Sequence, residues 1–447
     1  MAGRRIDVEA LIDGQKFGAF PLRVLVLALL ALVIEGYDVQ VMSFAAPSLL
    51  KTWHLQRAAF APVLSASLAG IMFGAPLLGW VGDRVGRKTC ILISSVLYGL
   101  LSLCLLLAHD LNTLVVLRFL AGLGMGGVVP NAIALAAELA PKRMRAGMAG
   151  FIAVGITIGG IAPGLIVAQL PPGPVFTELF LIGGLAPLVL AAIIALGQPE
   201  SIAFLIQRGG SKARISSLAN QIDPALGASP DDDFVLPQRP AGEAVGYPAL
   251  FAGKLNVITP LLWVMFAASL LSLFMLTSWM PLLLEASGFS AKAAAGTNSL
   301  FQIGGAVSGL VVALLLGRLG ARLPFAMFVL ALITVAVAAR APLTRQGLEI
   351  AITVCGFCIT GIQCSLNGTA GLAYPTPVRS RGLGAALGVG RIGAVVGPLV
   401  AGAMVASGVT SARDLFLLPL LPLAVATVAS FVVVRLLDLR QAPGAVA

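Results

Sequence analysis

Two acidic residues, Glu35 and Asp38, lie in an otherwise apolar stretch near the start of this 447-residue chain. They are three residues apart, so on a helix they share one face. A charge at the centre of a bilayer costs at least about 2.5–3.5 kcal/mol and persists where it is paired or meets water. A buried carboxylate with a second one nearby favours its protonated form. The pair is therefore predicted to carry protons; a structural ion pair with Arg118 is the alternative.

Two arginines, Arg118 and Arg391, also lie inside apolar stretches. Arg118 is a few residues from the outer end of its stretch, at a depth that suits contact with Asp38. Arg391 is about ten residues into its stretch, which at ~1.5 Å per residue places it near mid-membrane. No acidic residue of the second half reaches that depth, so Arg391 is predicted to bind the carboxylate of an anionic substrate. A structural pair with Glu35 or Asp38 is the alternative.

Uncharged side chains complete the predicted substrate site. Asn131, Gln302 and Asn367 are amides inside apolar stretches, where an unpaired amide is costly. Tyr37 and Trp279 are positioned to stack on an aromatic ring, although packing in the core is the alternative for any single aromatic residue. With Arg391 and Arg118, these residues form the predicted substrate-binding set.

The elements that position these residues are membrane helices. The chain is 58% hydrophobic and 11% charged, against roughly 25% charged for soluble domains. Apolar segments near the ~20 residues needed to cross a bilayer recur along its length. The chain is therefore predicted to be an all-α membrane protein with twelve spans, at 21–46, 60–82, 90–108, 112–138, 146–170, 176–197, 255–284, 294–317, 323–341, 347–373, 382–406 and 412–436.

The spans fall into two halves of six. We expect a cytoplasmic N-terminal segment (1–20), a first half (21–197), a cytoplasmic linker without chemistry of its own (198–253), a second half (254–437) and a cytoplasmic tail (438–447). With both termini in the cytoplasm, 21 of the 27 Lys and Arg residues other than Arg118 and Arg391 lie on the cytoplasmic side. The other six are Lys51, Arg57, Lys292, Arg340, Arg345 and Arg413.

A weak repeat relates the two halves. The stretch Gly79–Lys88 follows the second span, and a degenerate copy, Gly317–Arg322, follows the eighth. Pro141, Arg145, Gly150 and Gly159 match Pro375, Arg379, Gly384 and Gly393 at a constant offset of 234 residues. Two pseudo-symmetric halves with a substrate site between them are typical of secondary transporters.

At these residues the sequence resembles the major facilitator superfamily, whose best-known signature is the GxxGDRxGRK loop. The resemblance implies that Asp83, Arg84 and Arg87 form a cytoplasmic gate, in which Asp83 accepts hydrogen bonds from the start of the eleventh span. Glu138 and Arg145 are expected to join this cluster. A positively charged membrane anchor is the alternative.

Four stretches resemble, more narrowly, the bacterial aromatic acid:proton symporter family. They are Glu35–Asp38; Arg118–Gly127 with Pro130–Ala132; Ser278–Pro281; and Tyr374–Thr376 with Gly388–Gly393. That family usually has Asp at the position of Glu35, so the resemblance favours Asp38 as the main proton carrier. It implies 4-hydroxybenzoate or protocatechuate as the substrate, and a bacterial inner-membrane location.

Other classes of function fit less well. The basic residues lie in short loops rather than in a patch with aromatics, so nucleic acid is not expected as a partner. Cys355 and Cys358 form an isolated CxxC, so neither a metal nor a cofactor is expected. The only histidines, His54 and His109, fall in outer loops, which argues against an enzyme. The prediction is a monomeric proton-coupled importer of a small aromatic carboxylate, with a drug or metabolite exporter as the alternative.

Overall fold

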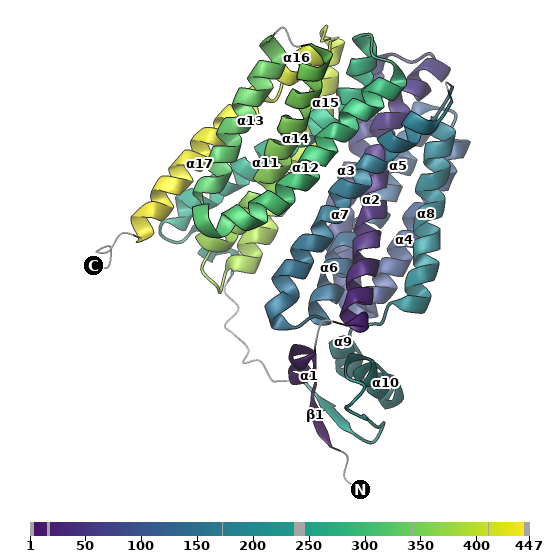
Figure 1. Ribbon diagram of the computed structural model, residues 1–447, viewed down its shortest axis with the longest axis vertical. Coiled ribbons are helices and arrows are strands. Elements are labelled where there is room, and N and C mark those ends of the chain that lie inside the picture. The colour runs from purple at the N-terminus through teal and green to yellow at the C-terminus, as the bar shows by residue number, and fades with distance from the viewer. Residues whose placement is uncertain are drawn as a thin grey trace.

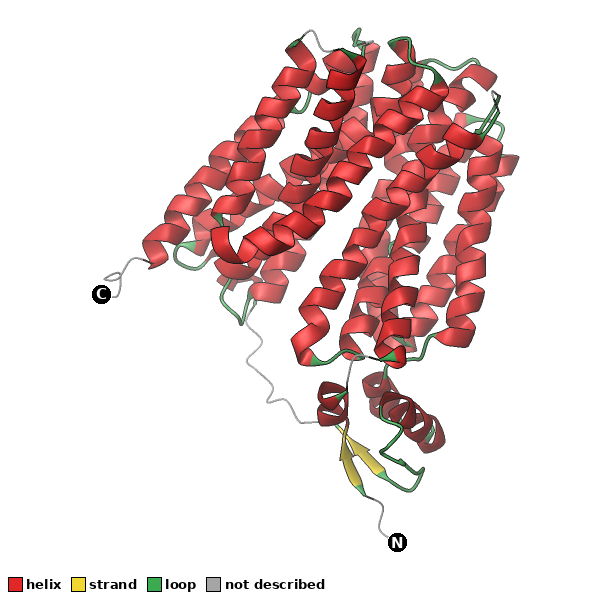
Figure 2. Ribbon diagram, in the orientation of Figure 1, coloured by secondary structure: helices red, strands yellow, loops and turns green. Residues whose placement is uncertain are grey.

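The structure is a computed structural model that describes residues 4–15, 18–171, 173–236, 246–341, 344–409 and 411–441. Figure 2 shows a molecule built almost entirely of helices. Within the described residues, twelve helical segments are long and apolar enough to cross a membrane, which confirms the predicted fold class. They are α2 (Ala19–Thr52), α3 (Ala61–Val85), α4 (Arg87–Cys104), α5 and α6 (Leu111–Met125, Val128–Glu138), α7 (Lys142–Gln169), α8 (Phe176–Gly197), α11 (Leu255–Ala286), α12 (Ala291–Leu319), α13 (Arg322–Arg340), α14 (Arg345–Ala373), α15 (Arg379–Ala406), and α16 and α17 (Ala412–Leu417, Leu420–Gln441).

The fourth span differs from the single helix expected at 112–138, because it is broken at Gly126 and Gly127. Two adjacent glycines lower helix propensity. They also let α3 approach closely: a Cβ added to Gly126 would lie 2.5 Å from the nitrogen of Ala75, and one on Gly127 would lie 2.8 Å from Cβ of Leu78. The break is thus a packing feature, not a loop between spans.

The predicted repeat is present in the packing. A Cβ on Gly159 of α7 would lie 1.8 Å from the carbonyl oxygen of Val33 on α2, and one on Gly393 of α15 would lie 2.1 Å from that of Ala267 on α11. Val33 and Ala267 are themselves 234 residues apart. Small residues allow membrane helices to pack at such short backbone separations. The two halves are therefore built on the same pairs of crossing helices.

Gly159→Ala is expected to destabilise the protein, because its methyl group would overlap backbone rather than a movable side chain. Overpacking of this kind costs typically about 1–3 kcal/mol. The control is Gly150→Ala in the same helix, since a Cβ there meets nothing within 4 Å. The midpoint of thermal unfolding in detergent should fall for Gly159→Ala and not for Gly150→Ala. Equal midpoints would contradict the packing described here.

The two halves meet on one side of the molecule and diverge on the other (Figure 1). The side on which α2 begins and α17 ends is called the terminal side, and the opposite side the far side. On the far side, Lys51 Nζ of α2 lies 2.6 Å from Glu285 Oε2 of α11, and Gly402 of α15 packs against Ala61 of α3. On the terminal side of α15, a Cβ added to Gly384 or Gly388 meets nothing within 4 Å. The structure is thus closed on the far side and open on the terminal side.

Two short strands and three short helices form a small unit beneath the first half. It comprises β1 (Arg5–Asp7), α1 (Val8–Gly14), α9 (Ile202–Gln207), α10 (Lys212–Ile222) and β2 (Asp233–Val235), and is called the terminal-side unit. β1 and β2 pair in parallel, with Arg5 opposite Asp233. Arg4 Nη2 lies 3.3 Å from Asp232 Oδ2. Hydrogen bonds from the backbone of Ser229 and Arg4 hold the pKa of Asp232 below its usual value.

The terminal-side unit is fastened to the loop between α6 and α7. Lys142 Nζ lies 3.0 Å from carboxylate oxygens of both Glu9 and Asp13, and Gln15 Nε2 donates to the carbonyl oxygen of Leu139 over 2.8 Å. Hydrogen bonds from Lys142 lower the pKa of Asp13. The expected N-terminal segment and linker are therefore partly folded together. Residues 237–245 of the linker and 442–447 of the tail lie outside the described residues.

Candidate functional site

Asp38 and Arg118 form an ion pair in the interior of the first half. Arg118 Nη1 donates to Asp38 Oδ2 over 3.0 Å, and Nη2 donates to the Asp38 carbonyl oxygen over 3.1 Å. Ser102 donates to Asp38 Oδ1 over 3.1 Å. Both charged side chains are 1% exposed. Removing one partner of such a pair leaves an uncompensated buried charge, which costs about 3–5 kcal/mol.

The local sequence of α2 explains why Asp38 points into the first half. Gly36 faces α7, where an added Cβ would lie 2.1 Å from the carbonyl oxygen of Ile156. Tyr37 faces α8, since its hydroxyl donates to the carbonyl oxygen of Leu179 over 2.8 Å. These two contacts fix the rotation of α2, and Asp38 is left facing α4 and α5.

Glu35 lies one turn from Asp38 and has a different environment. It is 3% exposed, and its Oε2 has no hydrogen-bond partner within the described part of the chain. Its charge interacts with that of Arg391 on α15, in the other half. Arg391 is half-buried and makes no hydrogen bond or ion pair among the described residues. A carboxylate and a guanidinium, neither with a hydrogen-bond partner in the described structure, therefore lie on opposite halves of the protein and face each other.

The two side chains predicted to stack on a substrate ring, Tyr37 and Trp279, instead pack against other parts of the protein. Trp279 is 0% exposed, and its indole nitrogen donates to the carbonyl oxygen of Pro398 over 3.0 Å. Its ring lies against Gly402 at the far-side closure. Tyr37 is 5% exposed and bound to α8. In this conformation neither ring is brought together with Glu35 and Arg391.

The three predicted amides lie in three different environments. Asn131 is buried within the first half, where its nitrogen donates to the carbonyl oxygen of Gly127 over 2.7 Å. Gln302 on α12 lies against Gly160 of α7, at the boundary between the halves. Asn367 is exposed on α14. Only Gln302 lies at a contact between the two halves.

Two residues of the site were missed by the sequence reasoning. Asn298 on α12 is 0% exposed, and neither atom of its amide has a partner among the described residues. Tyr98 on α4 is also fully buried with an unpartnered hydroxyl, within electrostatic reach of both Glu35 and Asp38. A buried amide without partners costs free energy that a ligand recovers. Asn298 fell near the end of an expected span, where a polar residue requires no explanation.

The predicted gate residues lie together at the terminal side, except that Arg84 stacks on Trp80, 3.6 Å from its ring centroid. Arg87 forms ion pairs with both Asp83 and Glu138, with Nε 3.4 Å from Glu138 Oε1. The side chain of Asp83 is 61% exposed. No hydrogen bond from the described part of α15 reaches Asp83, in keeping with the separation of the halves on this side.

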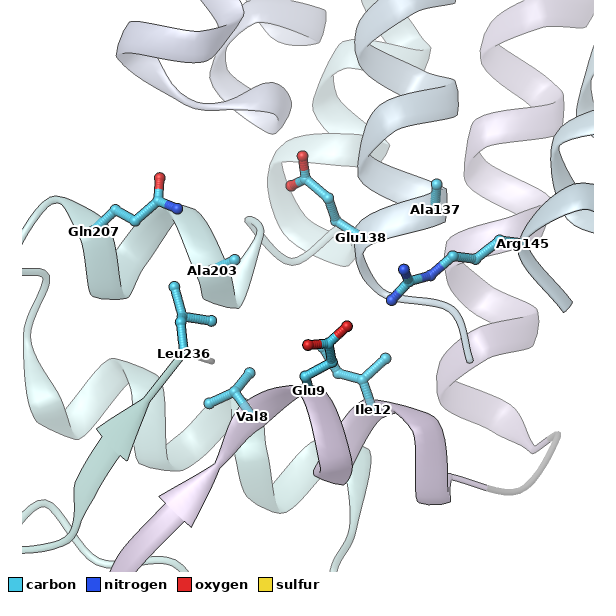
Figure 3. A pocket seen from close by; sticks show the side chains of 9 residues that line it. All are labelled: Val8, Glu9, Ile12, Ala137, Glu138, Arg145, Ala203, Gln207 and Leu236. Carbon is cyan, nitrogen blue, oxygen red and sulfur yellow. The ribbon is translucent and has the colours of Figure 1, made fainter. Parts of the chain in front are cut away.

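Glu138 and Arg145 also line a cavity of about 480 Å³ beneath the first half, together with Glu9 of the terminal-side unit. Figure 3 shows the side chains of Glu9 and Arg145 directed towards each other, while the Glu138 carboxylate points away from them. Arg145 Nε donates to the carbonyl oxygen of Ala140 over 3.0 Å, and Arg379 repeats this contact with Tyr374 over 3.3 Å. The arginines are 234 residues apart, so the α6–α7 loop and the equivalent α14–α15 loop of the second half are held by the same hydrogen bond.

The helical fold and the repeat lead to a family. Residues 28–398 match the model of the Major Facilitator Superfamily. The chain belongs to the major facilitator superfamily. This membership confirms the resemblance stated from the sequence. The members of the family are membrane transporters, which also confirms that the chain is not an enzyme.

Curated relatives cover nearly the whole chain. The 4-hydroxybenzoate transporter PcaK of Pseudomonas aeruginosa is 33% identical over 429 residues, covering 96% of each chain. The gallate transporter of Pseudomonas putida is 34% identical over 404 residues, covering 90% of each. The benzoate transport protein of Acinetobacter baylyi is 29% identical, covering 89% of this chain and 86% of its own.

Solved structures share the fold. A bacterial homolog of the human lysosomal transporter Spinster aligns with a TM-score of 0.73 at 17% identity, covering 96% of this chain and 100% of its own. The xylose transporter XylE from E. coli aligns with a TM-score of 0.70 at 14% identity, covering 94% of this chain and 98% of its own. These likenesses concern the arrangement of the twelve spans.

Proposed function

We propose that the protein imports a small aromatic carboxylate together with protons, by alternating access across a bacterial inner membrane. The single observation that carries the proposal is the unpartnered Arg391 opposite Glu35, between the two halves. A guanidinium at this depth whose N–H donors bind no protein group favours an anionic ligand. The names of the relatives supply the chemical class: 4-hydroxybenzoate, gallate and benzoate are aromatic carboxylates.

Arg391 binds the substrate carboxylate through its planar fork of N–H donors, which matches a carboxylate in a bidentate way. Gln302 and the unpartnered Asn298 lie four residues apart on α12, so they share one face of that helix, in the half that carries Arg391. Their amides donate to and accept from polar groups on the ring. Arg118 is assigned a structural part, since its Nη atoms are already bound to Asp38 and Ser67.

Glu35 is assigned as the main proton carrier, and Asp38 and Tyr98 are assigned supporting parts in proton coupling. Glu35 carries an unpartnered oxygen in a buried position, and protonation removes the free-energy cost of that buried charge. Both carboxylate oxygens of Asp38 already accept hydrogen bonds, one from Arg118 and one from Ser102. The family resemblance favoured Asp38 as the main proton carrier, and this assignment places Glu35 first. The reason is that Asp38 is hydrogen-bonded to a cation, whereas Glu35 Oε2 has no hydrogen-bond partner in the described structure.

The terminal side is assigned to the cytoplasm, because most loop Lys and Arg residues lie there. The conformation described is then open to the inside and closed to the outside. Asp83, Arg87 and Glu138 are close enough to form one gate cluster. We propose that Asp83 accepts hydrogen bonds from the N-terminus of α15 when the inner side closes, where a carboxylate is favoured by the helix dipole.

The test is uptake of labelled 4-hydroxybenzoate, gallate and benzoate by the purified protein in proteoliposomes. An imposed inward proton gradient is expected to drive accumulation of at least one of them, and a protonophore to abolish it. A pH-sensitive dye trapped inside should report acidification that depends on the substrate. Uptake that is indifferent to the gradient would contradict proton coupling, and outward extrusion alone would contradict import.

A further inference from the structure

A second cavity lies on the far side, between the two halves and away from Glu35 and Arg391. Its volume is about 330 Å³, at the small end of the ~300–1,000 Å³ typical of ligand sites. It is called the outer cavity. Its lining comes from α2, the end of α7, the α7–α8 connection, α11 and α12: Phe44, Pro47, Ser48, Lys51, Thr52, Val167, Gly173, Pro174, Val175, Pro281, Glu285, Ala291 and Ala295.

The charged groups that line the outer cavity are Lys51 and Glu285, and they bind each other. Lys51 Nζ donates to Glu285 Oε2 over 2.6 Å. The two residues are 234 positions apart, the offset that relates the halves, so this pair joins equivalent points of the repeat. The ion pair therefore links the two halves directly, at the side where they are closed.

The two partners differ in exposure. The Lys51 side chain is 73% exposed and that of Glu285 is 13% exposed. An ammonium carries three N–H donors, and Glu285 is the one hydrogen-bond acceptor of Lys51 Nζ in the described structure. Lys51 thus retains donors that face the outside. Around it the lining is largely apolar, with the ring of Phe44, three prolines and two valines.

This combination fits one chemical class, a small ring that bears a carboxylate. We propose that the outer cavity is a first docking site for the aromatic carboxylate on its way in. There the substrate carboxylate binds Lys51 in place of Glu285 and so releases the ion pair that closes the outer side. The inference rests on the proposed function, and it adds a second substrate site and a trigger for outward opening.

The floor of the outer cavity leads towards the central residues. Phe44 and Ala295 line it and both lie against Gly164 of α7. Ala295, Asn298 and Gln302 then follow one another on α12 at spacings of three and four residues, so they share one face of the helix. A substrate released from Lys51 reaches the unpartnered amide of Asn298 next when the outer side opens.

The docking role makes the two single variants behave differently. Lys51→Gln removes the docking cation, so KM for uptake from outside is expected to rise roughly tenfold, the scale of one charge-assisted hydrogen bond. Glu285→Gln removes the competitor for Lys51, so the same KM is expected to fall below the wild-type value. An ion pair that served only as a latch would give both variants the same direction of change, because each breaks the same contact.

The measurement is the KM for labelled substrate added outside right-side-out vesicles, with efflux from preloaded vesicles as an internal comparison. Efflux KM should not change in either variant. Matched controls are Lys292→Gln, which removes a far-side cation beside the cavity, and Glu349→Gln, which breaks the far-side ion pair with Arg345. Both controls should leave the external KM unchanged.

The outcomes separate this inference from the proposed function. If both variants shift the external KM in the same direction, or if neither does, the docking site is wrong while transport by the wild type stands. If the wild type transports none of the aromatic carboxylates, the proposed function fails before either variant is compared.

Discussion

Arg391→Ala is expected to lower the uptake of every aromatic carboxylate that the wild type transports by roughly 30-fold or more at low substrate concentration. Arg391 is the half-buried cation opposite Glu35, and in the described structure no protein group binds its guanidinium. Its proposed partner is the carboxylate of the bound substrate, and truncating one member of such a desolvated, hydrogen-bonded charge pair costs about 2–5 kcal/mol. At about 1.4 kcal/mol per tenfold change, KM should rise by roughly 30-fold or more.

Arg391→Lys is the informative companion. It keeps the charge but replaces the planar fork with a single ammonium, so binding should be intermediate between wild type and alanine. Direct binding of substrate to the detergent-purified protein separates a loss of affinity from a loss of conformational change. The control is Arg435→Ala, because Arg435 is exposed on α17, where its guanidinium lies over the ring of Phe431. Wild-type affinity in Arg391→Ala would remove this residue from the substrate site.

The membrane-spanning helices of this protein could be predicted because each one is a long run of mostly apolar residues. All twelve expected spans match a helical segment of the structure, although α2 is longer than the expected 21–46. A run of apolar residues does not indicate where a helix is interrupted, so the break between α5 and α6 was not foreseen. That break depends on the close approach of α3, which is a tertiary contact.

The contact of Asp38 with Arg118 could be expected from the sequence. The two residues were predicted at a similar depth in the membrane, where an ion pair lowers the free-energy cost of both charges. The environments of Tyr37, Trp279 and Asn131 could not. These residues lie on spans that are apolar on every side, so no periodicity indicates which face meets a neighbouring helix. Gly36 fixes the rotation of α2 through its contact with the backbone of Ile156, and Gly402 allows the ring of Trp279 to pack at the far-side closure. For the same reason the orphaned amide of Asn298 could only be recognised in the structure.

Glu35→Gln is expected to uncouple transport from protons. The amide is nearly the same size as the protonated acid but cannot release a proton, so accumulation driven by an inward proton gradient should be lost. Exchange of labelled for unlabelled substrate needs no net proton movement and should persist. Because Glu35 has no protein counter-ion other than the charge of Arg391, the variant should fold normally.

Asp38→Asn should also stop accumulation, but for a different reason. It leaves Arg118 buried without its carboxylate, at a cost of about 3–5 kcal/mol, so thermal stability and exchange should fall together with uptake. Glu35→Asp is the matched control for Glu35→Gln, because it shortens the side chain but keeps a group that can bind and release a proton. Proton-driven accumulation, lost in Glu35→Gln, should be present in Glu35→Asp. If Asp38→Asn retained stability and exchange while Glu35→Gln accumulated substrate normally, the proton would have to be assigned to Asp38 and Glu35 to a packing role.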